Sequence, residues 1–77
     1  MTPKEIRETI GQNILQLRKN YGISRKALAR LIHIPENRLR RIETGDLNAK
    51  LYDFHLKRIA RIFDISVDLL FAPDLVP

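Results

Sequence analysis

The sequence predicts an all-α fold in which five helices form one compact domain and the second and third helices are joined by a tight turn. Apolar residues recur at three- and four-residue spacing over most of the 77 residues, as they do along the buried face of a helix. Thr2, Ser24 and Ser66 each precede such a segment and can accept a hydrogen bond from its first turn. We expect a single domain over residues 1–77, with its core in about residues 3–71 and a short apolar tail at 72–77.

The first helix should span residues 3–20. Thr2, Pro3 and Glu5 form the pattern of a capping box with proline in the first turn. One apolar stripe continues along the segment, made of Ile6, Ile10, Ile14, Leu17 and Tyr21. We expect this stripe to lie in the core and the helix to stop near Gly22.

The stretch 24–45 predicts two short helices. The first covers about 24–32, and its apolar residues are Ala27, Leu28, Leu31 and Ile32. Pro35 is excluded from a helix interior but suits the first turn of the next helix, about 35–44. In that helix Leu39 and Ile42 form a narrow apolar stripe, and Gly45 stands where a C-terminal cap belongs. At about 100° per residue the opposite face carries Asn37, Arg40, Arg41 and Thr44. A polar outward helix supported by a second helix has the form of a DNA-reading helix-turn-helix.

A fourth helix is expected over about residues 51–63. Its stripe consists of Tyr52, His55, Leu56, Ile59, Ile62 and Phe63. His55 is alone among apolar residues, so we interpret it as a core or boundary histidine rather than a metal ligand. Phe54 lies outside the stripe, which suggests contact with another element or a partner. Ser66 should cap a last short helix that contains Leu69, Leu70 and Phe71.

The net charge of +5 is unevenly distributed. Residues 1–23 carry +2, residues 24–45 carry +4 and residues 46–77 carry −1. An excess of positive charge on the two central helices fits either an ordinary solvated surface or a site for nucleic-acid phosphate. The outward Asn and Arg side chains favour the second interpretation.

Several function classes are disfavoured by what the sequence lacks. It has no cysteine, which fits a reducing cytoplasm and leaves neither disulfides nor thiolate metal sites. No apolar run approaches the roughly 20 residues of a membrane span. The sequence also shows no Gly-rich phosphate loop, no nucleophile paired with a base and no cluster of metal ligands, so we expect no enzyme, no metal and no cofactor.

Three segments together resemble the Cro/Xre family, the DNA-binding domain of lambdoid phage repressors. The first runs from Gly11 to Ser24 and the last from Ile59 to Phe71, and the middle one contributes Leu28, Ala29, Leu39 and the run from Arg41 to Gly45. The resemblance covers roughly residues 6–71. It implies a lambda-repressor-like domain of five helices, in which the third helix reads bases and homodimers bind palindromic operators.

The resemblance also implies roles for single residues. The base-reading positions of the family fall on Glu36, Asn37 and Arg41, and its phosphate-contacting position at the start of the second helix falls on Arg25. For Glu36, an alternative role is structural, because its negative charge interacts favourably with the positive end of the helix dipole. The family's partly buried ion pair falls on Arg18 and Glu43. Charge and position add further candidates for phosphate contacts, namely Lys26, Arg38, Arg40 and Thr44, and charge alone adds Lys50.

The sequence departs from the family pattern at three places. His33 stands where the family has a turn glycine, although His adopts the left-handed conformation more readily than most residues. Pro35 replaces the usual Ser or Thr cap, and the segment that follows Gly45 is about two residues longer than in the common pattern.

We therefore expect a sequence-specific regulator of transcription, most simply a repressor that binds double-stranded DNA as a homodimer. The alternative is a protein-interaction module on the same fold, such as an antitoxin-like protein that binds a protein partner. Apolar residues beyond those that a small core requires are candidates for a dimer contact, namely Phe54, Leu70, Phe71, Leu75 and Val76.

Overall fold

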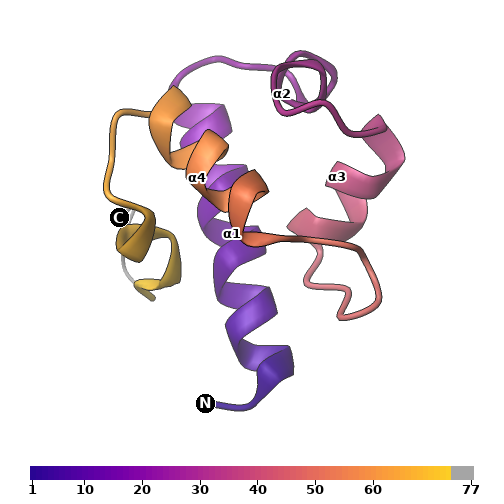
Figure 1. Cartoon of the computed structure of the whole chain (residues 1–77), viewed down its shortest axis with the longest axis vertical. Helices are drawn as coiled ribbons and strands as arrows, with labels where there is room; N and C mark the ends of the chain where they lie inside the picture. The colour runs from indigo at the N-terminus through magenta and orange to yellow at the C-terminus, as the bar shows by residue number, and fades with distance from the viewer. Residues whose placement is uncertain (74–77) are drawn as a thin grey trace.

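The computed structural model describes residues 1–73 (Figure 1). Four α-helices, α1 (Pro3–Asn20), α2 (Arg25–Leu31), α3 (Glu36–Glu43) and α4 (Asp53–Ile62), are followed by one 3-10 helix, η1 (Val67–Phe71). This part of the chain contains no strand, so the all-helical prediction is confirmed. The element expected as a fifth α-helix is instead the 3-10 helix η1. None of the helices in residues 1–73 combines the length and hydropathy that crossing a membrane requires.

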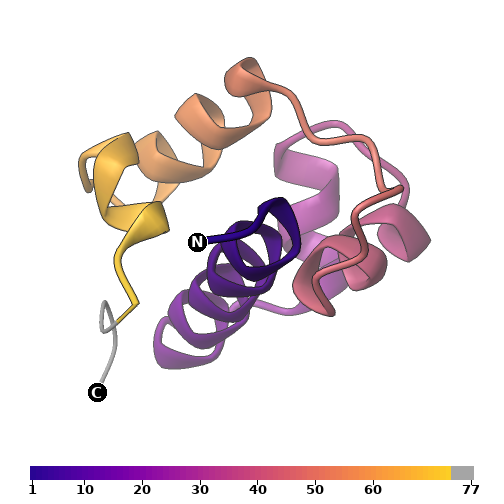
Figure 2. The same ribbon diagram turned by 90° about the horizontal axis from the view of Figure 1, so that it is seen from below.

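Helix α1 lies between two pairs of elements. The pair α2 and α3 lies on one side of it and the pair α4 and η1 on the other (Figures 1 and 2). Helix α1 packs directly against α3 and η1, while α2 packs against α3 and α4 against η1. The long first helix therefore supports the two short helices of the predicted helix-turn-helix.

Every element contributes to one core. The largest fully buried side chains are Ile14, Leu28, Ile32, Leu39, Ile42, Ile59, Phe63 and Leu70. The predicted stripes are correct except at Ala27, which is exposed, and at their margins, where Tyr21, Leu31 and Tyr52 are at least half exposed. Tyr21 follows the end of α1 and Tyr52 precedes the start of α4, so neither is held within a helical face.

Each α-helix ends with a residue in the left-handed conformation. These residues are Gly22, His33, Gly45 and Asp64, with φ between 55° and 81°. In each case the next N–H donates to a carbonyl five residues earlier, as Ile34 does to Ala29 at 3.0 Å, and this closes the helix. His33 therefore adopts the turn that glycine gives elsewhere in the family. Asp64 was not anticipated from the sequence.

Gly11 sets the close approach of α1 to α3. A Cβ atom at this position would collide with the carbonyl oxygen of Ile42 and would lie 3.0 Å from the carbonyl carbon of Glu43. The glycine therefore lets the backbone of α3 lie directly against α1.

Asn13 is a buried polar residue that the apolar pattern did not predict. Its Nδ2 donates to the carbonyl oxygens of Leu70 and Ala72, each at 2.8 Å. Because Asn13 is on α1 and its acceptors lie at the end of η1, these bonds fix η1 on the central helix.

Candidate nucleic-acid interface

The outward face of α3 carries the predicted polar set. Asn37, Arg40, Arg41 and Thr44 are exposed, while Leu39 and Ile42 are completely or almost completely buried on the opposite face. Since the apolar residues fix how the helix rolls on the core, they also fix which side chains face solvent. Arg38, a predicted phosphate contact, is only half-buried at the edge of this face.

The first turn of α3 differs slightly from the prediction. Pro35 is the N-cap, with φ of −62°, and the helix begins at Glu36. The N–H groups of Arg38 and Leu39 donate to the Pro35 carbonyl at 3.1 and 3.2 Å, and no side chain caps the helix. Glu36 is exposed in the first turn. This position allows both roles considered for it, a contact with a base and a favourable interaction with the helix dipole.

A buried carboxylate joins three elements behind this face. Glu43, at the end of α3, accepts from Arg18 Nε at 2.8 Å and from Arg18 Nη2 at 3.1 Å. The two side chains are only 1% and 10% exposed. This two-point pair connects α1 to α3 with the geometry that arginine and carboxylate prefer.

Arg25 makes a third bond to the same carboxylate. Its Nε donates to Glu43 Oε1 at 2.9 Å, and its side chain is 29% exposed. Arg25 therefore connects the start of α2 to the end of α3, a contact that the sequence did not predict. Lys26, next to it, is exposed, whereas Arg25 is only partly exposed. Ser24 caps α2 as predicted, with its Oγ accepting from the Ala27 N–H at 3.0 Å.

Arg41 is held at the end of α3 by Asp46. Its Nε donates to Asp46 Oδ2 at 2.8 Å, and both side chains remain partly exposed. The Asp46 pKa is lowered below its usual value, first by this hydrogen bond and then by the N–H of Asn48. Thr44, another predicted phosphate contact, donates its hydroxyl to the Arg41 carbonyl at 2.9 Å.

The loop between α3 and α4 returns to the outward face. Pro35, Asn37, Arg38, Arg41, Asn48 and Lys50 line one shallow depression. The structure therefore brings Lys50, which was chosen from its charge alone, beside the predicted base-reading residues. Asn48 joins them, although no feature of the sequence marked it.

Arg7 fixes this loop from behind. Its Nη1 donates to the Ala49 carbonyl at 2.8 Å and to the Asp46 carbonyl at 3.3 Å. Arg7 is 39 and 42 residues away from its acceptors, and its position next to Ile6 in the apolar pattern gave no indication of this contact.

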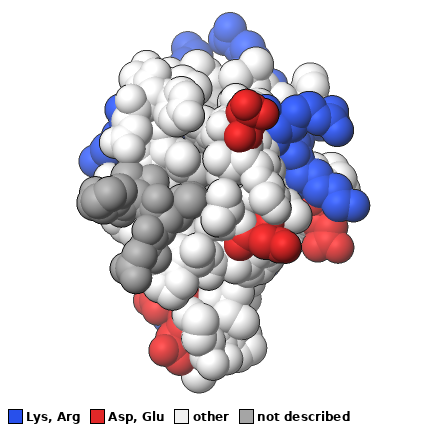
Figure 3. Space-filling model, turned by 90° about the vertical axis from the view of Figure 1, so that its left-hand side faces the viewer, with Lys and Arg blue, Asp and Glu red and all other residues white. Residues whose placement is uncertain are grey.

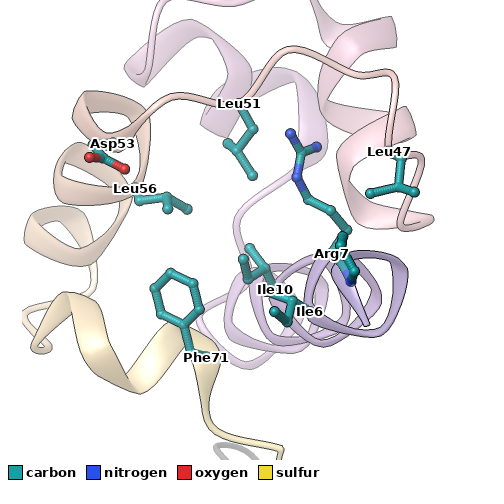
Figure 4. Close-up of a pocket in the computed structure, with 9 residues that line it drawn as sticks. Ile6, Arg7, Ile10, Leu47, Leu51, Asp53, Leu56 and Phe71 are labelled. Atoms are coloured by element: carbon teal, nitrogen blue, oxygen red, sulfur yellow. The ribbon is translucent and has the colours of Figure 1, made fainter. Parts of the chain in front are cut away.

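The α4 and η1 side has a different surface character. Most of it is uncharged, Lys and Arg lie along its margins, and patches of Asp and Glu lie among the uncharged residues (Figure 3). An open groove runs beside it, where Ile10, Leu51, Leu56 and Phe71 face a common space (Figure 4).

The candidate dimer residues are not all on the surface. Phe54 is 56% exposed and Phe71 is 42% exposed. Leu70 is fully buried and belongs to the core, so its assignment to a dimer contact was wrong. Leu75 and Val76 lie outside the described residues.

His55 is buried, as expected, and caps α4. Its Nδ1 accepts from the Tyr52 N–H at 3.0 Å, so the imidazole acts as an acceptor. Burial lowers the His55 pKa, and the positive charges of Arg38 and Arg58 lower it further. Within residues 1–73 no three His, Asp or Glu side chains come together in a way that would hold a metal ion.

A family model described as helix-turn-helix matches residues 14–70, which is most of the chain and includes α2, α3 and α4. A search of curated proteins found no match.

Proposed function

Because the chain belongs to the Cro/C1-type helix-turn-helix family of DNA-binding transcription regulators, we propose that it is a repressor which occupies a palindromic operator as a homodimer. The observation that carries the proposal is the outward face of α3. There Asn37 and Arg41 are exposed beside Lys50, over a helix that is fixed from behind by buried contacts.

Each exposed group has a corresponding partner on DNA. Arg can donate two hydrogen bonds to guanine and Asn can bond to both edge groups of adenine in the major groove. Lys26, Arg40 and Lys50 are exposed and are suited to phosphate contacts, which position a protein without reading sequence. In this proposal the protein acts by occupying its site, without a cofactor or a chemical step.

The homodimer rests on the apolar surface of the α4 and η1 side. Phe54 and Phe71 are exposed there, and we propose a two-fold contact through them that brings two α3 helices to one duplex. The spacing of the half-sites would then be about one helical turn, 10–10.5 bp, or a multiple of it.

Selection of duplexes from a random DNA library by the purified protein tests this proposal. Enrichment of an inverted repeat with that spacing supports a dimeric regulator. If no sequence is enriched and binding simply disappears as salt rises, the basic surface is only a non-specific phosphate binder.

Two variants then separate the two kinds of contact. Arg41→Ala should reduce the binding free energy by about 1–3 kcal/mol, through the loss of recognition at one base pair of the half-site. Lys26→Ala should weaken binding to all sequences similarly, and the slope of the logarithm of the binding constant against the logarithm of salt concentration should become shallower by about 1. Sequence preference that is unchanged in Arg41→Ala would show that the reading face is assigned wrongly.

A second candidate function is supported by the groove in Figure 4. Its lining is mainly apolar, and Leu47 and Phe71 in it are each about two-fifths exposed. A protein-interaction module, such as an antitoxin-like protein, would use this groove for a partner chain. Stoichiometric capture of a protein without any duplex binding would favour this function over the first.

A further inference from the structure

Asp46 is fixed at three points by the backbone and by Arg7. Its N–H donates to the Arg41 carbonyl at 3.0 Å, its carbonyl accepts from Arg7 Nη1 at 3.3 Å, and its Oδ1 accepts from the Asn48 N–H at 2.8 Å. The last bond is the local turn in which an aspartate side chain holds the backbone two residues ahead. The position of the second carboxylate oxygen therefore depends little on the Arg41 side chain.

That second oxygen, Oδ2, accepts from Arg41 Nε at 2.8 Å. The contact uses the inner nitrogen of the guanidinium. Among residues 1–73, neither terminal nitrogen of Arg41 donates a hydrogen bond, and the side chain is 49% exposed. The two terminal nitrogens are the groups that can donate together to O6 and N7 of guanine.

The ion pair is poorly explained by stability alone. Exposed ion pairs contribute little to folding because water and salt screen them. A carboxylate beside the candidate DNA surface also repels phosphate. Both considerations indicate that the role of Asp46 is to fix the direction of the long, flexible Arg41 side chain before Arg41 contacts a base.

We propose that Asp46 is a positioning residue for base recognition, which holds Arg41 with its terminal nitrogens directed at a guanine and so increases discrimination at that base pair. This inference rests on the proposed function, because it requires that Arg41 reads a base. It assigns Asp46 no contact with DNA.

Asp46→Asn is the variant that isolates this role. The asparagine side-chain oxygen can still accept from the Asn48 N–H, but its NH₂ group cannot accept from Arg41 Nε. Asp46→Ser provides a second variant, since its hydroxyl can also hold the turn. Asp68→Asn is the matched control, because Asp68 is exposed on η1 and its substitution also removes one negative charge. Thermal unfolding of each variant identifies any that fails to fold.

The experiment measures equilibrium binding, at one salt concentration, to the duplex selected by the wild-type protein and to duplexes with each base pair changed singly. Discrimination is the ratio of the binding constants for the selected duplex and for a duplex with one base pair changed. In Asp46→Asn this ratio should fall about two- to ten-fold at the base pair read by Arg41, the range expected when one long side chain is no longer ordered before binding. Binding to unrelated duplexes should stay equal or become tighter, since a negative charge has been removed. Asp68→Asn should keep the wild-type discrimination.

The same substitution in the Arg41→Ala background tests whether Asp46 acts through Arg41. Without Arg41, Asp46→Asn should leave base discrimination unchanged, because the coupling requires both residues. Unchanged or improved discrimination in the single variant would overturn the proposal, and so would an equal loss in both backgrounds. If the wild-type protein selects no sequence at all, the proposed function itself fails and this inference fails with it.

Discussion

Glu43→Gln is the substitution that best tests how α3 is held. The Glu43 side chain is 1% exposed and accepts three hydrogen bonds, two from Arg18 and one from Arg25. Gln has the same shape but only one acceptor oxygen, and its NH₂ group would face an arginine donor. One or two of the charge-assisted bonds would be lost, and both arginines would lose the buried charge that compensates them.

The expected cost is about 3–5 kcal/mol, which is typical when one partner of a buried ion pair is removed. A chain of this length has about 4–12 kcal/mol of total stability, so the substitution should remove a large part of it. The midpoint of thermal unfolding, followed by circular dichroism, should fall by about 15–30 °C.

The control is Glu36→Gln, which changes the same residue type on the exposed face of the same helix. It should leave the midpoint nearly unchanged. A fall of less than about 5 °C in Glu43→Gln would refute the reasoning, because it would mean that water reaches this site or that the arginines find other partners easily.

Three further changes test other contacts. Gly11→Ala should lower the free energy of unfolding by about 1–3 kcal/mol, because the added Cβ collides with the backbone of α3. Urea unfolding would measure this loss as a lower midpoint, with the dependence of the unfolding free energy on urea concentration unchanged. For His55, the folded pKa lies below the unfolded value, so its contribution to stability is complete above the unfolded pKa of about 6.5 and is lost as pH falls toward the folded pKa. The unfolding midpoint should therefore drop between pH 7 and 5, and less steeply in His55→Gln, whose oxygen can still cap α4. Arg7→Leu should speed amide hydrogen exchange in the loop 46–50, because the two carbonyl contacts are lost; unchanged exchange there would show that the loop is held by other contacts.

The helices and the outward face of α3 could be predicted because they depend on local order in the sequence. Ser24, Pro35 and Gly45 delimit the two short helices, and the spacing of Leu39 and Ile42 alone determines that Asn37 and Arg41 face solvent. The pairing of Arg18 with Glu43 came from the family resemblance, since residues 25 positions apart carry no periodic signal. The membership itself is confirmed by the match over residues 14–70.

Two of the contacts that were missed connect side chains to backbone atoms far away in the sequence. Arg7 and Asn13 both donate to carbonyl groups in loops or helix ends, and no pattern in the chain marks a carbonyl as an acceptor. Asp46 reaches Arg41 only because Gly45 adopts φ of 81° and turns the chain back. Leu70 was misplaced for a related reason, since composition shows an excess of apolar residues but not which of them the core uses.

Several of the tertiary contacts gather at one location, the C-terminal end of α3. The close approach of Gly11, the three bonds to Glu43 and the Arg41–Asp46 pair all act within the last three residues of that helix and the residue that follows Gly45. The N-terminal end, by contrast, begins at Pro35 without a side-chain cap. Asn37 therefore projects from the less constrained end of α3 and Arg41 from the end that these contacts hold. We expect a substitution at Gly11 or Glu43 to alter the direction of the whole helix. Its effect on recognition should spread over every base pair of the half-site, whereas the effect of a change at Asn37 should stay at one.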